Sequence, residues 1–232
     1  MVARRISTGA ERQLFARNLV ETRRTKGAGF SETQSSKVGE VHLAFGRLYG
    51  IYDDQAGNPA EMIAGFVMHD LASFPQSYPK PDLTHLPPNR VFECGELWAR
   101  VAGGADVARQ AIWLLLGLAK AEAMVAYPIF KPWNLTLAYR EHFTRVGEPI
   151  EWPYACATDG SKIFVQAIIS TGEELRALVA EAAQHGFEAS SDLDWVCFNT
   201  RHCIFRRGRE RRRVGLVVPE RVVPAGNARV VA

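Results

Sequence analysis

The segment 106–126 is the strongest structural signal in the sequence. Its large apolar residues recur at helical spacing around most of a helix: Ile112, Trp113, Leu115, Leu116, Ala119 and Ala123. A helix that is apolar almost all round is buried, because it has no face that suits water. We therefore predict a buried helix over 106–126, with Asp106 near its N-cap, and further layers that cover it.

Strand and helix patterns flank this segment on both sides. The elements expected before it are a helix over 8–25 with Ser7 or Thr8 as cap, a hairpin of 41–52 with 62–68, a proline-rich loop over 71–90 and a strand over 91–101. Those expected after it are a strand over 125–130, a helix over 134–146 ended by Gly147, strands over 150–156 and 163–169, a helix over 173–185 with a capping box at 171–174, and a strand over 195–205. Gly95 breaks the alternation of the strand 91–101 and predicts a bulge there. The order fits neither an all-parallel alternation nor an antiparallel sandwich, so we predict a mixed α/β fold.

Length and composition bound the organisation of the chain. Its 232 residues are 47% hydrophobic and 23% charged, which favours one α/β domain, placed over 1–207. No window reaches the roughly 18 apolar residues of a membrane span, and no apolar stretch follows the basic start, so we expect a cytoplasmic protein. The four cysteines are expected to be free thiols. The cluster 197–203 lacks a second ligand pair at usable spacing, so no metal site is predicted.

Arginines crowd the segment 206–213, where Glu210 is the only acidic residue. We interpret 208–232 as a basic, flexible tail, because short charge blocks are usually solvated. Two alternatives stay open: the run contacts nucleic-acid phosphates, or it contacts the acidic face of an acyl carrier protein. Nucleic acid is the less favoured, because the rest of the chain lacks the interleaved basic and aromatic residues of such surfaces.

The ordered set of segments over 11–186 resembles the GNAT acyltransferase superfamily, in particular the branch of acyl-homoserine-lactone synthases and N-acyl-amino-acid synthases. The segments that carry the resemblance are Leu48-Tyr-Gly-Ile-Tyr-Asp-Asp with Met62-Ile-Ala-Gly-Phe-Val, Phe74-Pro with Tyr78 and Pro81-Asp-Leu, Phe92-Glu-Cys-Gly-Glu-Leu-Trp-Ala, Phe143-Thr-Arg-Val-Gly, and Lys162-Ile-Phe-Val-Gln-Ala with Ser170-Thr-Gly-Glu-Glu-Leu. The resemblance implies a three-layer αβα fold with a mixed, mainly antiparallel sheet bulged at its central strand. It also implies N-acyl transfer from an acyl thioester, acyl-CoA or acyl-acyl carrier protein, to the amine of an amino acid or similar molecule. No permanently bound cofactor is implied.

Four positions depart from the family pattern. Aligned on Leu114-Leu115, the R/Q-x-x-G-x-G/A motif at the start of the central helix falls on Asp106, Arg109 and Ala111, of which only the last fits. This loss makes acyl carrier protein the more attractive donor. The general-acid tyrosine falls at Phe143, and the arginine that follows the strand glutamate in lactone synthases falls at Glu96.

The resemblance assigns roles to specific residues. Glu93 and Glu96 are the candidate bases, and they share a face of the strand only if a bulge at Gly95 brings them together. The other candidates are backbone N–H groups of Leu97, Trp98 and Ala99 for the thioester oxygen, Arg100 and Arg109 for donor phosphates, and Trp98, Trp113, Trp133 and Phe143 for an acyl pocket. The alternative function is a non-catalytic GNAT-like binding module for a protein or nucleic acid, in which these residues are ordinary core and surface positions.

Overall fold

The computed structural model describes residues 1–25, 46–53, 62–73, 80–130, 143–157, 160–184 and 186–198. Nine strands of these residues form one mixed sheet in the order β10-β11-β1-β2-β3-β4-β5-β9-β6. The strands are β1 (Val2–Arg5), β2 (Arg47–Tyr52), β3 (Met62–Asp70), β4 (Val91–Ala99), β5 (Ala123–Ala126), β6 (Thr144–Arg145), β9 (Ile168–Thr171), β10 (Phe187–Ala189) and β11 (Trp195–Phe198). Neighbouring strands are antiparallel except β4 and β5, which are parallel.

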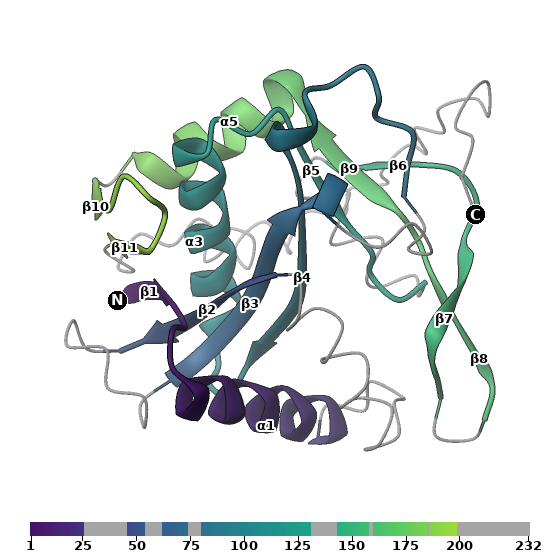
Figure 1. Cartoon of the computed structure of the whole chain (residues 1–232), viewed down its shortest axis with the longest axis horizontal. Coiled ribbons are helices and arrows are strands. Elements are labelled where there is room, and N and C mark those ends of the chain that lie inside the picture. The colour runs from purple at the N-terminus through teal and green to yellow at the C-terminus, as the bar shows by residue number, and fades with distance from the viewer. Residues whose placement is uncertain are drawn as a thin grey trace, which may run out of the picture.

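Helices cover both faces of this sheet (Figure 1). Helix α1 (Gly9–Thr25) lies on one face, and α3 (Gly104–Leu118) and α5 (Gly172–Ala183) lie on the other. The strands β7 (Ile150–Cys156) and β8 (Lys162–Val165) form a separate antiparallel hairpin beside the main sheet. The predicted three-layer αβα fold is therefore confirmed. No helix of the described residues is long and apolar enough to cross a membrane.

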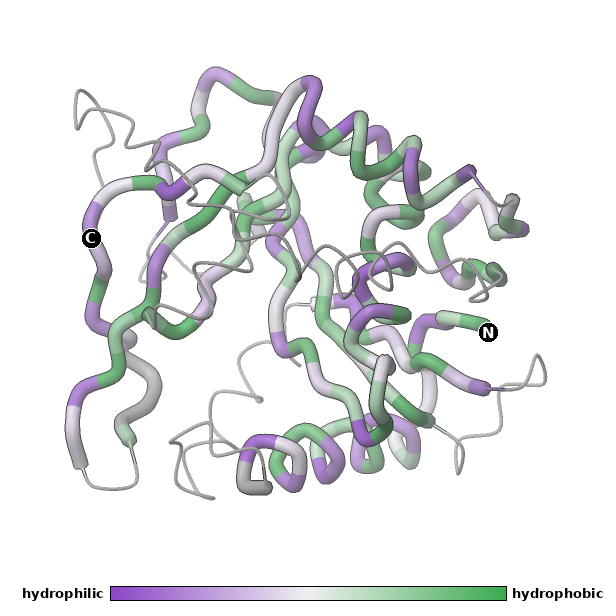
Figure 2. The backbone as a smooth tube through the Cα atoms, turned by 180° about the vertical axis from the view of Figure 1, so that it is seen from behind, coloured by the Kyte–Doolittle hydropathy of each residue, from purple (hydrophilic) through white to green (hydrophobic). Residues whose placement is uncertain are grey.

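Helix α3 is the buried helix that the sequence predicts, but it is shorter. Figure 2 shows the contrast between its largely hydrophobic turns and the mixed turns of α1. The helix ends at Leu118 because Lys120 takes a left-handed φ of 52° and the Ala121 N–H bonds to the Leu116 carbonyl. The residues after this turn form β5, buried in the sheet. The prediction of helix through 126 is wrong, because an apolar run continues from a buried helix into a buried strand without a change of pattern.

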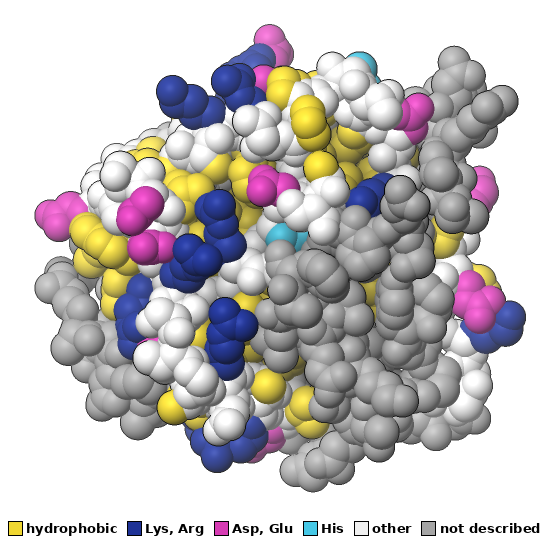
Figure 3. Space-filling view, viewed as in Figure 1, with side chains coloured by type: hydrophobic (Ala, Val, Ile, Leu, Met, Phe, Trp, Pro, Cys, Tyr) yellow, Lys and Arg dark blue, Asp and Glu magenta, His cyan; other side chains and the backbone are white. Residues whose placement is uncertain are grey.

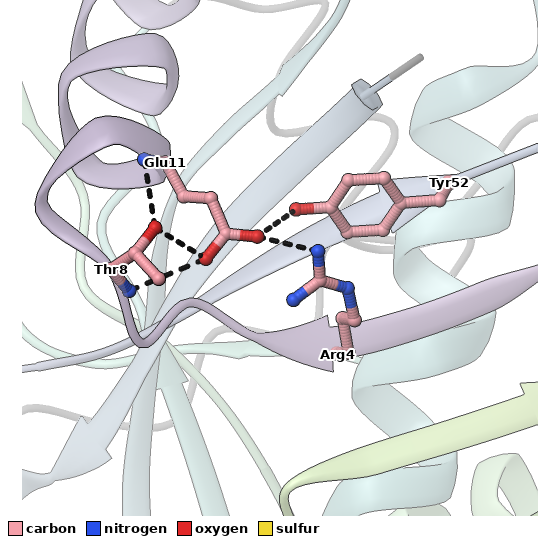
Figure 4. Close-up of polar contacts among 4 residues, drawn as sticks. All are labelled: Arg4, Thr8, Glu11 and Tyr52. Carbon is pink, nitrogen blue, oxygen red and sulfur yellow. Dashed lines mark hydrogen bonds and ion pairs between the residues drawn. The ribbon is translucent and has the colours of Figure 1, made fainter. Parts of the chain in front are cut away.

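The start of α1 is fixed by a capping box (Figure 4). The Glu11 N–H donates to Thr8 Oγ1 at 3.2 Å, and the Thr8 N–H donates to Glu11 Oε2 at 3.3 Å. Arg4 Nη2 donates to Glu11 Oε1 at 2.5 Å, and its guanidinium lies 4.5 Å from the centre of the Tyr52 ring. Arg4 belongs to β1, a strand that the sequence analysis did not predict. These contacts tie the first strand to the first helix.

Close packing of α1 on the sheet depends on Gly65 of β3. A Cβ at this position would lie 2.6 Å from the Phe15 ring and 2.8 Å from the Trp98 indole. These two rings meet edge to face, with centroids 5.5 Å apart. The glycine therefore lets an aromatic pair from α1 and β4 sit directly on the backbone of β3.

Other predicted elements need correction. Residues 131–142 and 199–205 lie outside the described residues, so most of the predicted helix 134–146 and the end of the last strand stay predictions. Thr144–Arg145 is strand β6, so Gly147, with φ of 63°, follows a strand and ends no helix. The predicted strand 163–169 is two strands, β8 and β9, because the chain passes there from the hairpin to the main sheet. Thr171 is the N-cap of α5 without a side-chain hydrogen bond, so the predicted capping box does not form.

Candidate active site

The strands β4 and β5 part in the middle of the sheet. Their parallel pairing covers only Val91–Ala123, Phe92–Met124 and Glu93–Val125. Strand β4 then continues to Ala99, whereas β5 ends at Ala126. The two strands are therefore not paired with each other beyond Glu93 and Val125. We call this break in their pairing the β4–β5 gap.

A bulge deforms β4 along this gap. The register against β3 runs from Val67–Gly95 to Gly65–Trp98, so that one residue of β3 faces Glu96 and Leu97 together. Glu96 has a φ of 51°, the left-handed region in which a side chain is strained. The predicted bulge near Gly95 is confirmed, and it is Glu96 that takes the unusual backbone conformation.

The bulge brings both predicted bases onto the face of the sheet that carries α1. Glu96 forms an ion pair with Arg23, near the end of α1, with only 4% of its side chain exposed. Glu93 Oε2 lies 3.1 Å from His69 Nε2, and both of these side chains are buried. Strict alternation would have placed the two glutamates on opposite faces.

Two further ionisable residues surround Glu93. Lys80 is half-buried, and burial lowers its pKa, although the Glu93 charge opposes that change. Tyr127 follows β5 directly, and burial together with the Glu93 charge raises the pKa of its hydroxyl. Burial also lowers the pKa of His69 to about 3. Glu93 therefore has a neutral imidazole, a protonated phenol and a lysine around it.

These three residues were not among those predicted from the sequence. His69 carries a weak signal, because it is a polar residue that directly follows the apolar segment 62–68. Nothing in the sequence pairs it with Glu93, which lies 24 residues further on. Lys80 and Tyr127 lie just outside predicted strands, where a single sequence does not distinguish site residues from surface residues.

The start of α3 lies where β4 ends. The helix begins at Gly104 with Gly103 as N-cap, and no side chain of the described residues caps it. A Cβ at Gly104 would lie 3.1 Å from the Cβ of Ala99, so this glycine permits close packing of the helix on β4. Backbone N–H groups at such a helix start can bind phosphate.

The observed helix start corrects the placement of the glycine motif. The sequence Arg100-Val-Ala-Gly-Gly-Ala105 fits R/Q-x-x-G-x-G/A at all three positions, Arg100, Gly103 and Ala105. The placement on Asp106, Arg109 and Ala111, which came from the alignment on Leu114-Leu115, is wrong, because Asp106 lies in the first turn of α3 and not before its start. The argument for acyl carrier protein from a lost motif fails with it.

The remaining predicted site residues are not all brought together. Trp98 packs with α1, whereas Trp113 and Phe143 pack on the opposite face of the sheet, with ring centroids 5.8 Å apart. The sheet therefore separates Trp98 from Trp113 and Phe143, and Trp133 lies outside the described residues, so the acyl pocket stays a prediction. Arg100 is exposed, Leu97 is 38% exposed, and Arg109 Nη1 donates to Asp106 Oδ1 at 2.9 Å.

A separate hollow of about 740 Å³ lies over β1 and β11. The strands β2 and β3 separate it from the β4–β5 gap. Arg4, Arg5 and Arg12 line it together with the exposed Trp195. Figure 3 shows Lys and Arg side chains on the side of the molecule where β1 lies. Arg4 and Arg5 already pair with Glu11 and Asp194. In the described residues, no group of three or more His, Cys, Asp or Glu side chains could hold a metal ion.

Solved structures share this fold. FeeM, an N-acyl amino acid synthase from uncultured soil microbes, superposes with a TM-score of 0.51 at 13% identity, over 77% of this chain and 94% of FeeM. The chain has the GNAT fold. A protein described as an acetyltransferase matches with a TM-score of 0.51 at 16% identity, over 82% of this chain and 93% of its own. A protein described as a phosphinothricin N-acetyltransferase matches with a TM-score of 0.50 at 11% identity, over 74% and 98%.

The sequence itself matches no protein-family model and has no significant match among curated proteins. The solved structures confirm the resemblance for the GNAT fold. The finer resemblance to lactone synthases stays a prediction.

Proposed function

We propose that the protein is an N-acyltransferase that moves an acyl group from acyl-CoA to the amine of an amino acid or similar small molecule. The observation that carries the proposal is the position of Glu93. Its carboxylate is buried at the point where β4 and β5 part. A gap beside a buried carboxylate suits a thioester and a base that takes a proton from the attacking amine.

The reaction needs a base for the amine proton, a donor to the developing oxyanion and a proton for the leaving thiolate. The acceptor nitrogen attacks the thioester carbonyl carbon, a C–N bond forms and the C–S bond breaks. The amine proton passes to Glu93, directly or through one water, and the leaving thiolate takes a proton back from Glu93 or from solvent, so that an amide and a thiol are formed. Burial and the Glu93 charge raise the pKa of Tyr127, so its hydroxyl keeps its proton and can donate a hydrogen bond to the developing oxyanion.

The donor phosphates are assigned to the start of α3. Gly103, with a φ of 80°, has open space where a side chain would be, so backbone N–H groups can approach a pyrophosphate there. Arg100, exposed at the end of β4, supplies the nearby cation. Acyl carrier protein remains a second donor to test, because its prosthetic arm presents the same thioester.

The competing function is a non-catalytic binding module. It is favoured by one observation, that both glutamates already have partners in the protein, the buried His69 and the partly buried Arg23. In that case the two pairs would serve only the fold.

Thiol release from acetyl-CoA and decanoyl-CoA, measured with a mixture of L-amino acids, separates these functions. We expect Glu93→Gln to lower the rate at least about a hundredfold, the usual scale of general base catalysis. The exposed Glu151→Gln is the matched control and should keep full activity. Arg100→Ala should raise the KM for the acyl-CoA about tenfold, the scale of one hydrogen bond to a charged group, and leave kcat unchanged. Full activity in Glu93→Gln, or no transfer from either CoA thioester or from acyl carrier protein, would overturn the proposal.

A further inference from the structure

His69 faces Glu93 directly across two strands. The two residues are register partners in the β3–β4 ladder, and Glu93 is in turn the register partner of Val125 in β5. One row across three strands therefore runs from the imidazole to the edge of the β4–β5 gap. The exposed fraction of the side chain is 1% for His69 and 2% for Glu93. Their contact is direct, because His69 Nε2 and Glu93 Oε2 lie 3.1 Å apart.

Burial disfavours the charged form of the imidazole, because an ion loses its hydration there. Burial is the largest cause of its pKa of about 3, Asp70 opposes that shift, and Lys80 adds to it. Glu93 itself, Cys94 and Tyr127 are the other titratable groups near the pair. A neutral imidazole carries one N–H, on either nitrogen. An ionised Glu93 has only acceptor atoms, so the hydrogen bond between them requires the proton on Nε2.

We propose that His69 is a positioning residue, whose Nε2–H holds the Glu93 carboxylate in one orientation beside the β4–β5 gap. The proposal rests on the proposed function, in which Glu93 takes the amine proton. The neutral donor orients the carboxylate and leaves its charge uncancelled. An imidazolium in the same place would form an ion pair and weaken the base.

Loss of this donor should change the titration of Glu93. A hydrogen bond to the ionised form favours ionisation, so its removal from a buried carboxylate raises the pKa of the base. The expected rise is about one to two pH units, the scale of one hydrogen bond to a charged group. The acid limb of the pH–rate profile should move up by that amount.

The test compares His69→Leu, which removes the donor, with His69→Gln, whose amide N–H can replace it. In the acetyl-CoA assay, we expect His69→Leu to move the acid limb up by about one to two pH units and to lower kcat near pH 7 about tenfold to a hundredfold. The KM for acetyl-CoA should not change, and His69→Gln should restore most of the activity. A purely structural role predicts equal loss of folded protein in both variants and an unmoved acid limb, and this result would overturn the proposal.

A second measurement needs no variant of His69. The ¹⁵N shifts of the ring should show a protonated Nε2 and an unprotonated Nδ1 in the resting protein at pH 7. An imidazolium, or a proton on Nδ1, would overturn the positioning role even in an active enzyme. A protein that has the expected tautomer but transfers no acyl group would overturn the proposed function and, with it, the positioning role.

Discussion

Arg23, near the end of α1, forms a partly buried ion pair with Glu96, the residue at which β4 bulges. The exposed fraction of the side chain is 16% for Arg23 and 4% for Glu96. Glu96 also has a φ of 51°, a conformation that costs a residue other than glycine about 1–2 kcal/mol. The ion pair therefore ties α1 to the strained residue beside the β4–β5 gap.

Replacement of this arginine should be costly. Arg23→Met leaves a buried carboxylate without that cation, and we expect a loss of about 3–5 kcal/mol in the free energy of unfolding, measured by urea denaturation. Arg23→Met combined with Glu96→Gly should recover much of the loss, because the carboxylate is gone and glycine suits the positive φ. Arg90→Met, in the exposed pair with Glu122, is the control and should cost less than about 1 kcal/mol. Similar losses for Arg23→Met and Arg90→Met would contradict this account.

The capping box of α1 distinguishes two adjacent hydroxyl residues that the sequence offers as equivalent caps. Thr8→Ala removes the acceptor of the Glu11 N–H, and we expect it to lower the free energy of unfolding by about 1 kcal/mol. Ser7→Ala should have no measurable effect, because Thr8 makes the capping contacts. Equal midpoints for the two variants in thermal denaturation would show that Thr8 is not the cap.

Glu11 should contribute to acid sensitivity. Burial raises its pKa, but hydrogen bonds from Thr8 and the charge of Arg4 outweigh that effect, so its pKa in the folded protein lies below the usual value. A group with a lowered folded pKa stabilises the protein above its unfolded pKa, and this contribution is lost as the pH falls through the folded pKa. Glu11→Gln should therefore be less stable than the natural protein at pH 7, and the difference should shrink as the pH falls below about 4.5. A difference that does not change with pH would refute this role.

Gly65→Ala tests the close contact of α1 with the sheet. The added methyl would overlap the Phe15 and Trp98 rings, and we expect a loss of about 1–3 kcal/mol from overpacking. Gly9→Ala, at the start of α1, has nothing within 4 Å of its added methyl and should be neutral or slightly stabilising. Thermal denaturation of the two variants measures the difference, and an unchanged Tm for Gly65→Ala would show that α1 can move away without cost.

The basic segment 206–213 lies outside the described residues, so its role stays a prediction. A chain that ends at Gly208 should fold and transfer acyl groups from acetyl-CoA at nearly the rate of the full chain. If the segment docks acyl carrier protein, truncation should weaken only the reaction with that donor, and added salt should have the same effect. A truncated chain that no longer folds, or a salt-sensitive DNA complex formed only by the full chain, would contradict the tail interpretation.

The sequence predicts best where one local pattern dominates. The amphipathic spacing of α1, the hairpin of β2 with β3 and the bulge beside Gly95 follow from periodicity and from a glycine in a strand. It predicts worst where apolar residues continue across an element boundary, as between α3 and β5. The alignment on Leu114-Leu115 also misplaced the start of α3, so it missed the glycine motif at Arg100, Gly103 and Ala105.

The sequence by itself determined a mixed α/β fold and the bulge, because helical and strand periods and a glycine break are local properties. The three-layer arrangement and the candidate bases Glu93 and Glu96 came from the resemblance to the GNAT superfamily. Only the tertiary structure decided which groups meet these glutamates. His69, Arg23 and Tyr127 reach them from β3, α1 and the chain after β5, and such encounters depend on strand register and helix packing. A shift of one residue in register would turn His69 to the other face of the sheet, so no local pattern could have named it.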